Sequence, residues 1–313
     1  MKIYEYLPGK SIISNTAIAL GFFDGVHKGH RLLLKTTRNL AKEKNLTFAV
    51  FTFRSENSFK IGGSVYSTEE KLEIFESLGV EAVILADFSS VAGISADDFV
   101  RSALVKDMGC RAAVAGYDFR FGNKAAGNAE LLKSILTELG AACVIEEEQQ
   151  IDGGKISTTA IKELLLSGDV KNAKRYLETP YFITATVTRG NGVGKKLGFP
   201  TVNTSLPLGR TAMKRGVYRT AVAIDGALYS SVTNVGVCPT FDERESHAET
   251  YIIDYSGDLY GKKIRIFFLD YLREEIKFKD PKSLVLQINI DINRVLKENG
   301  ELKWQEIGLS LPQ

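Results

Sequence analysis

Residues 16–30 contain the most restrictive pattern in this chain of 313 residues. The apolar run Thr16-Ala17-Ile18-Ala19-Leu20 has the composition of a buried strand, and a turn rich in Gly and Asp follows it. From Gly29 onward, the apolar spacing over residues 31–41 predicts a helix. A buried strand that passes through a glycine turn into a helix is the first part of an α/β unit, so we expect the chain to begin with a parallel sheet.

The first half of the chain repeats this alternation of strand and helix. Apolar runs predict strands over 46–53, 80–86, 111–116 and 142–145, and helical spacing predicts helices over 68–79, 95–108, 130–139 and 169–177. Thr68 is the expected N-cap of its helix, and Gly79 is the expected stop. Right-handed crossovers would join the strands into a parallel sheet that binds ligands at the carboxyl ends of its strands.

The pattern changes at Tyr181 to short strands with alternating character. Strands are predicted over 182–188, 217–224, 227–232, 250–255 and 264–272, and a helix over 281–297. Asp225-Gly226 between two of these strands predicts a hairpin with a type I′ turn. We therefore expect an α/β domain over residues 1–180 and an antiparallel β-barrel domain with a terminal helix over residues 181–313, with the boundary near Pro180.

Two of the three histidines, His27 and His30, lie three residues apart where the first helix begins. At this spacing both imidazoles can lie beside the free N–H groups of the first helical turn, which favour an anion such as a triphosphate. The alternative is that both rings are polar side chains satisfied within a turn. Gly21 and Gly25 favour the ligand site, because they allow the backbone to approach a bound molecule closely.

Two later loops also have a composition that suits ligands. Asp118 and Phe119 lie in a loop of alternating aromatic and charged residues over 116–122, which could hold a planar ring or could be a surface turn. Ser157-Thr158-Thr159 precedes a helical stretch that contains Lys162. These hydroxyl groups could contact phosphate or could serve only as helix caps.

Composition excludes several other classes of protein. The net charge of +2 gives no electrostatic reason to expect nucleic acid or an anionic membrane as a partner. No apolar run approaches the roughly 18 residues of a membrane span, and the first residues lack a signal-peptide core, so we expect a cytoplasmic protein. Cys110, Cys143 and Cys238 are widely spaced, which favours buried free thiols. The sequence leaves the oligomeric state open.

Gly21–His30 resembles the signature of the His-x-Gly-His nucleotidylyltransferases, and its Phe-Asp-Gly-Val-His form is typical of prokaryotic bifunctional riboflavin kinase/FAD synthetases. The resemblance extends through 116–122, 156–162, 200–203, 234–241, 249–254, 258–261 and 272–278. It implies a Rossmann-like N-terminal domain that adenylylates FMN to FAD and releases pyrophosphate. ATP would contact Gly21, Phe22, His27, His30, Ser157, Thr158 and Lys162, and the flavin would contact Asp24, Asp118 and Phe119.

The same resemblance implies that the C-terminal barrel phosphorylates riboflavin to FMN with ATP. Pro200-Thr201-Val202-Asn203 is similar to the riboflavin-kinase signature, in which the Thr and Asn positions hold Mg²⁺ and phosphates. Hydroxyl and amide oxygens suit this cation, which binds largely through phosphate and water. Glu249, at the start of its strand, would be the general base. Arg273 and Glu249 would lie beside the flavin. ATP would contact Gly192, Gly194, Lys195, Thr201 and Asn203.

Two positions depart from the family pattern in the N-terminal half. Lys162 stands where relatives usually have Arg, which replaces a bidentate fork with a point charge. Glu56 stands where relatives usually have His, and a carboxylate there would repel a triphosphate. Two alternatives to a fully bifunctional enzyme therefore stay open: a riboflavin kinase with a weak or inactive adenylyltransferase domain, and a non-catalytic regulator that binds flavin or nucleotide.

Overall fold

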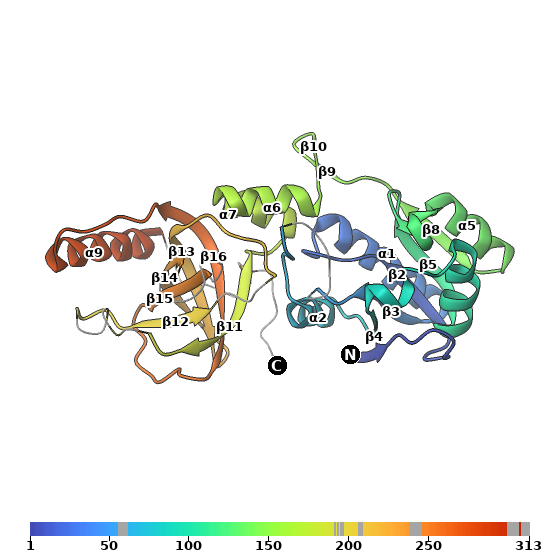
Figure 1. Ribbon diagram of the computed structural model, residues 1–313, viewed down its shortest axis with the longest axis horizontal. Helices are drawn as coiled ribbons and strands as arrows, with labels where there is room; N and C mark the ends of the chain where they lie inside the picture. The colour runs from blue at the N-terminus through green and yellow to red at the C-terminus, as the bar shows by residue number, and fades with distance from the viewer. Residues whose placement is uncertain are drawn as a thin grey trace. The chain divides into compact units, whose positions relative to one another are not determined.

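The computed structural model describes residues 1–55, 62–190, 192, 194, 197–205, 209–237, 246–298 and 307. The chain forms two compact units, Met1–Thr158 and Thr159–Gln313 (Figure 1). Beyond Thr158, helix α6 (Thr158–Ser167) belongs to the second unit, and so does α7 (Val170–Leu177). The functional boundary near Pro180 stays a prediction.

The first unit contains the predicted parallel sheet, which is confirmed. Its six strands are arranged in the order β1-β4-β3-β2-β5-β8, with every neighbouring pair parallel. They are β1 (Lys2–Glu5), β2 (Thr16–Leu20), β3 (Thr47–Phe53), β4 (Ala82–Ala86), β5 (Cys110–Gly116) and β8 (Ala142–Glu146). Every residue of β2 and β4 is buried, which explains their uninterrupted apolar runs.

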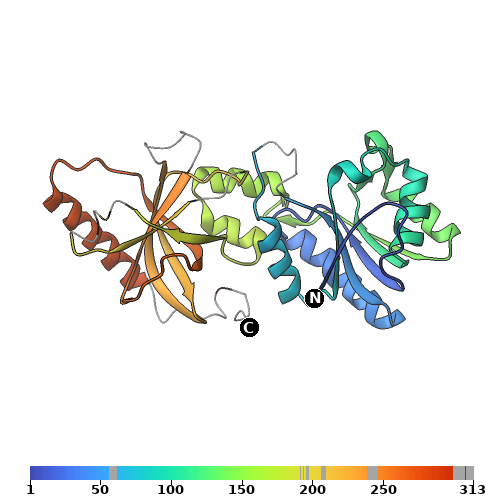
Figure 2. The ribbon, with the colours of Figure 1, turned by 60° about the horizontal axis from the view of Figure 1, so that its bottom comes forward.

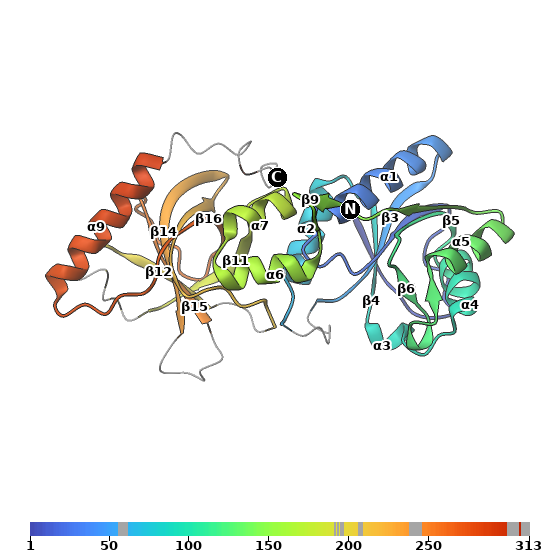
Figure 3. The same ribbon diagram turned by 90° about the horizontal axis from the view of Figure 1, so that it is seen from above.

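Helices cover this sheet on both faces. They are α1 (Lys28–Lys44), α2 (Thr68–Ser77), α3 (Phe88–Val91), α4 (Ala96–Asp98), the π-helical η1 (Phe99–Asp107) and α5 (Ala129–Glu138). Figure 3 shows α1 on one face and α4 and α5 on the other. Short elements complete the unit: β6 (Arg120–Phe121), η2 (Asn123–Ala125), β7 (Gly127–Asn128), β9 (Gln150–Ile151) and β10 (Gly154–Lys155).

One predicted cap is wrong, because Ser67 rather than Thr68 precedes the first turn of α2. The Ser67 hydroxyl accepts the Glu70 N–H at 3.2 Å, and the Glu70 carboxylate accepts the Ser67 N–H at 2.9 Å. This reciprocal capping box satisfies two backbone donors that helical bonds leave free. The Thr68 hydroxyl instead accepts the backbone N–H of Ser55 at 2.8 Å.

The second unit contains the predicted antiparallel barrel, which is also confirmed. Six strands close in the order β11-β12-β15-β14-β13-β16. They are β11 (Phe182–Thr188), β12 (Thr201–Ser205), β13 (Gly216–Ile224), β14 (Ala227–Val237), β15 (Ser246–Ile252) and β16 (Lys263–Arg273). Positive φ angles at Asp225 (48°) and Gly226 (80°) fit the expected type I′ turn. The terminal helix α9 (Pro281–Glu298) lies beside the barrel (Figure 2).

Buried hydroxyl groups from three strands form a chain inside the barrel. The Thr220 hydroxyl lies 2.7 Å from that of Ser231 and 2.8 Å from that of Thr233. Thr233 continues the chain to Thr250 at 2.9 Å. All four residues are fully buried. Their hydrogen bonds to one another satisfy polar groups that would otherwise be costly in this core.

Candidate functional site

The carboxyl end of the parallel sheet borders a cavity of about 820 Å³ in the first unit. Residues at the ends of β2, β3, β5 and β8 line it, as the α/β topology predicts. Eight of the residues predicted for adenylyl transfer line this cavity: Gly21, Phe22, His27, His30, Asp118, Phe119, Ser157 and Thr158. The fold therefore brings together three motifs that are far apart in the sequence.

One side of this cavity is strongly aromatic. The rings of Phe22 and Phe53 lie 4.5 Å apart between centroids, and those of Phe119 and Phe121 are stacked at 5.6 Å. Phe99 on η1 lines the same region and packs on Phe121 at 5.3 Å. Such a surface can hold a flat aromatic ligand by stacking and apolar contact.

The two histidines lie at the beginning of α1. His27 is the N-cap residue, and its Nδ1 accepts the backbone N–H of His30 at 3.3 Å. The two imidazole rings are stacked, with centroids 3.6 Å apart and planes 15° apart. Because Nδ1 of His27 is an acceptor, the neutral ring carries its proton on Nε2. The site thus offers an Nε2–H donor beside a helix N-terminus, which favours phosphate.

A strained turn leads into this helix. Phe23 and Val26 have φ angles of 51° and 41°, and both side chains are fully buried. A β-branched residue rarely adopts this left-handed conformation, so the surrounding packing must enforce it. Two hydrogen bonds hold Asp24 within the turn: Oδ1 accepts the N–H of Val65 at 2.8 Å, and the carbonyl oxygen accepts the Thr158 hydroxyl at 3.0 Å.

Two predicted residues are not among the described residues that line this cavity, and a third falls outside the described part of the chain. Asp24 is buried and is not among the described residues that line it. Its hydrogen bond to Val65 gives it a role in shaping the turn, while flavin contact by Asp24 stays a prediction. Lys162 lies on α6 within the second unit, also outside the described lining. Glu56 lies outside the described residues.

Four side chains at the cavity form a polar cluster in which only Asp118 was assigned a role from the sequence. The Lys155 ammonium group lies 3.3 Å from Asp118 and 3.5 Å from Glu148, and it donates to the Tyr117 hydroxyl. Tyr117 in turn donates to Glu148 at 2.5 Å. All four residues line the cavity. The sequence signal for Lys155 was its place immediately before the Ile-Ser-Thr-Thr stretch, where a cation can reach a bound phosphate.

A second cavity, of about 270 Å³, lies in the barrel unit. Glu249, Thr201, Gly194 and Arg273 line it, and each was predicted for the kinase site. Glu249 was expected to open its strand, but β15 begins at Ser246, so Glu249 lies inside the sheet. It pairs in register with Asn203 on β12 and with Asn234 on β14. Two amide side chains therefore flank this carboxylate on neighbouring strands.

Thr201 and Asn203 lie outside every strand predicted from the sequence, but they belong to strand β12. Pairing with β15 makes this segment a strand, although the Gly and Pro residues on either side of it are typical of a loop. A Cβ added to Gly190 would lie 2.2 Å from Nδ2 of Asn203, and one on Gly194 would lie 3.3 Å from Oγ1 of Thr201. The absence of a Cβ at these two positions allows the backbone to pass close to both side chains.

Not all of the predicted kinase residues can be placed in the second cavity. Asn203 and Gly192 are described but are not among its lining residues. Lys195 lies outside the described residues. Asn234 and Asp291 also line the cavity. Asn234 belongs to the 234–241 motif, where it was given no role, and Asp291 was not singled out in the sequence.

Two family models match the chain in succession. The model described as FAD synthetase matches residues 10–160, and the model described as riboflavin kinase matches residues 177–298. A "Bifunctional riboflavin kinase/FMN adenylyltransferase" of Bacillus subtilis is 32% identical over 300 residues, covering 93% of this chain and 94% of the relative. A relative with the same name from Haemophilus influenzae is 32% identical over 290 residues, covering 90% and 93%.

A solved structure is similar over nearly the whole chain. It is named "Crystal Structure of Macrolide-efflux Protein from Streptococcus pneumoniae", with a TM-score of 0.85 and 29% identity, and the match covers 95% of this chain and 99% of that one. The activity in this name differs from those named by the family models and the two relatives, so we take only the fold from it. Among the described residues, no helix has both the length and the apolar character needed to cross a membrane.

Proposed function

Because the chain belongs to the family of bifunctional riboflavin kinases/FMN adenylyltransferases, we propose that it makes FAD from riboflavin in two steps. The second unit phosphorylates riboflavin to FMN with ATP, and the first unit transfers AMP from ATP to FMN. The observation that carries this proposal is the succession of the two family models along the chain, each over one cavity that holds the matching motifs.

In the adenylyl transfer, an FMN phosphate oxygen attacks the α-phosphorus of ATP, and the bond from that phosphorus to the bridging oxygen breaks. Pyrophosphate leaves with the negative charge that develops. The Nε2–H of His27, the imidazole of His30 and the N–H groups of the first turn of α1 would stabilise this charge. The aromatic side of the cavity would hold the isoalloxazine ring. No protein nucleophile is required.

In the kinase step, the terminal ribityl hydroxyl of riboflavin attacks the γ-phosphorus of ATP, and ADP leaves. Glu249 would accept the hydroxyl proton as general base. Its side chain is 46% exposed, so it can reach a substrate in the cavity that it lines. Asn203 and Asn234 on the adjoining strands place hydrogen-bonding groups beside it.

The residues around Thr201 fit a magnesium ion that is held mainly by nucleotide phosphates. A hydroxyl and an amide oxygen are hard ligands, and glycine at 190 and 194 lets the backbone lie close to the side chains of Asn203 and Thr201. Within the described residues, no three His, Cys, Asp or Glu side chains are grouped to hold a metal ion by themselves. Thr201 and Asn203 would hold Mg²⁺, which would neutralise the transferred phosphate.

The product profile from riboflavin, ATP and Mg²⁺ tests this function, with chromatography resolving FMN from FAD. We expect FMN to rise first and FAD to follow. Formation of FMN without FAD, even at high enzyme concentration and with added FMN, would favour a kinase with an inactive adenylyltransferase domain. Lys162 and Glu56, which depart from the family pattern, are the reason for considering this alternative. Binding without any product would favour the regulator. We place the enzyme in the cytoplasm, where ATP is available.

A further inference from the structure

A buried carboxylate in the barrel cavity is paired with Arg273. The Asp291 side chain, on α9, is only 6% exposed. Arg273 donates from Nε to its two oxygens at 3.1 and 3.0 Å, and from Nη2 to Oδ2 at 2.7 Å. Gln287, one helical turn earlier, donates to Oδ1 at 3.0 Å. This geometry fixes the plane of the guanidinium group.

The pairing leaves part of the arginine available to a ligand. A guanidinium group has five N–H hydrogens. Asp291 takes the one on Nε and one on Nη2, and the carbonyl oxygen of Glu274 accepts one from Nη1 at 2.9 Å. Among the described residues, one hydrogen therefore remains without an acceptor on each terminal nitrogen. Arg273 and Asp291 both line the cavity, whose other walls include Phe199, Ile276 and Leu284.

We propose that Asp291, supported by Gln287, is a positioning residue for the flavin substrate of the kinase. It holds Arg273 in the orientation in which the two remaining N–H groups bind the acceptor edge of riboflavin. The isoalloxazine ring has carbonyl oxygens and ring nitrogens along one edge, and a fixed guanidinium fork matches such a planar acceptor. This inference rests on the proposed kinase function of the barrel unit.

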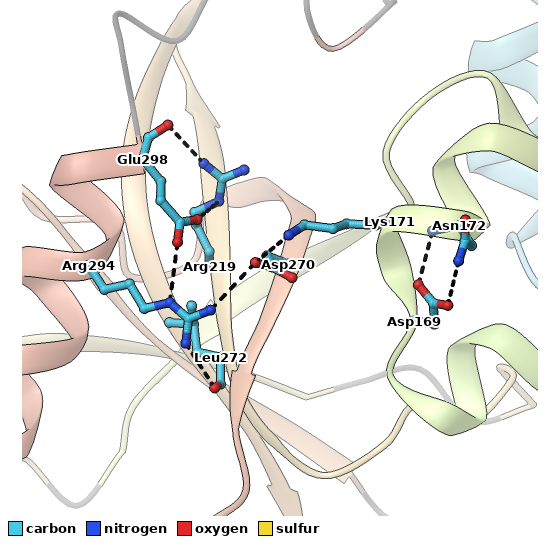
Figure 4. Close-up of polar contacts among 8 residues, drawn as sticks. All are labelled: Asp169, Lys171, Asn172, Arg219, Asp270, Leu272, Arg294 and Glu298. Atoms are coloured by element: carbon cyan, nitrogen blue, oxygen red, sulfur yellow. Dashed lines mark hydrogen bonds and ion pairs between the residues drawn. The ribbon is translucent and has the colours of Figure 1, made fainter.

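A second set of ion pairs holds the same helix outside the cavity and provides a matched control (Figure 4). Arg294 on α9 donates to the carbonyl oxygen of Leu272 at 3.2 Å and lies 3.9 Å from Asp270. Asp270 also pairs with Lys171 at 2.8 Å, and its side chain is 12% exposed. Asp270 is thus a buried, paired carboxylate like Asp291, but it is not among the described residues that line the cavity.

The test compares four variants of the full chain: Asp291→Asn, Arg273→Lys, Gln287→Met and Asp270→Asn. Initial rates of FMN formation are measured with riboflavin and ATP varied independently, and thermal unfolding is followed in parallel. We expect Asp291→Asn and Arg273→Lys each to raise the KM for riboflavin about 10-fold or more. Gln287→Met should raise it about threefold. Asp270→Asn should lower the Tm and leave the KM for riboflavin unchanged.

The combination of substitutions separates positioning from stability. Because Asp291 acts through Arg273, the double variant should raise the KM for riboflavin no more than the larger single change does. The KM for ATP should stay the same throughout. The proposal is overturned if the substitutions lower the Tm without changing the KM for riboflavin, or if they raise the KM for ATP instead. If Asp291→Asn does not fold, the KM values for riboflavin of Arg273→Lys and Gln287→Met still test the proposal.

Failure of the kinase function itself would look different. In that case the unaltered chain would form no FMN, whatever the variants do. Quenching of riboflavin fluorescence would then still report whether the variants weaken binding of the flavin. An active unaltered chain with an unchanged riboflavin KM in Arg273→Lys and Gln287→Met would refute the positioning role alone.

Discussion

His27 uses its two ring nitrogens for different purposes. Nδ1 accepts the His30 N–H and caps α1, while Nε2 is the nitrogen that would donate to a ligand in the cavity. The sequence left open whether this histidine is a phosphate-binding residue or a satisfied turn residue, and the structure shows that these roles are compatible. Asparagine reproduces the position of Nδ1, and glutamine reproduces that of Nε2, so the two roles can be tested separately.

We expect His27→Asn to keep the stability of the first unit and to lower the rate of FAD formation from FMN by about 100-fold or more, because the cap is retained and the Nε2–H is lost. His27→Gln should lose about 1 kcal/mol of stability and retain more activity. Thermal unfolding and initial rates with saturating FMN and ATP measure both effects. A fully active His27→Asn enzyme would show that the histidine serves the turn alone.

The cysteines offer a pH-dependent measurement in the folded protein. Burial raises the pKa of the Cys110 thiol to about 12 and that of the half-buried Cys143 to about 11. The thiolate is the reactive form, so both groups stay protonated and unreactive at pH 8. Cys238 lies outside the described residues.

Iodoacetamide at pH 8 should therefore modify Cys110 and Cys143 far more slowly in the native chain than in urea, where the thiol pKa returns to about 8.5. Peptide mass spectrometry resolves the three sites and keeps Cys238 separate. Native labelling should increase as the pH rises toward the raised pKa values. Equal labelling of Cys110 in the native and unfolded chain at pH 8 would contradict its burial.

Strands and helices with strong apolar spacing were predictable, whereas elements that depend on a distant partner were not. β1 lies at the sheet edge and is largely exposed. Lys2–Glu5 therefore contains no apolar run from which a strand could be predicted. β12 is polar and follows a Gly-rich stretch, and pairing with β15 decides its conformation. The Arg273–Asp291 pair joins residues 18 positions apart on a strand and a helix. Such contacts arise from tertiary packing, which local patterns do not encode.

The buried hydroxyl chain makes a prediction about the barrel strands. In Thr233→Val the central hydroxyl is lost, and Thr220 and Thr250 each lose a hydrogen-bond partner. We expect the free energy of unfolding of the barrel unit to fall by about 2 kcal/mol, because buried polar groups are left unsatisfied. Thr186→Val, at an exposed position on β11, is the matched control and should change stability by less than about 0.5 kcal/mol. Urea denaturation monitored by circular dichroism compares them, and equal effects would contradict the prediction.

The described residues that line each cavity belong to one compact unit. Each proposed reaction therefore has its own binding site, and FMN is the product of one and the substrate of the other. This organisation predicts that the two activities can be removed independently. Glu249→Gln should abolish FMN formation from riboflavin and leave FAD formation from added FMN unchanged, because Glu249 lies in the barrel cavity.

Mixing two inactivated enzymes tests whether FMN can travel between molecules. Glu249→Gln retains the adenylyltransferase site and His27→Asn retains the kinase site, so Glu249→Gln alone should make no FAD from riboflavin and His27→Asn alone should make it only very slowly. Together they should make it, after a lag in which free FMN accumulates, since FMN released by one molecule can bind another. The lag should shorten as the concentration of the Glu249→Gln partner rises, and added FMN should remove it. A mixture that makes FMN but no FAD, although Glu249→Gln alone adenylylates added FMN, would contradict free exchange of this intermediate.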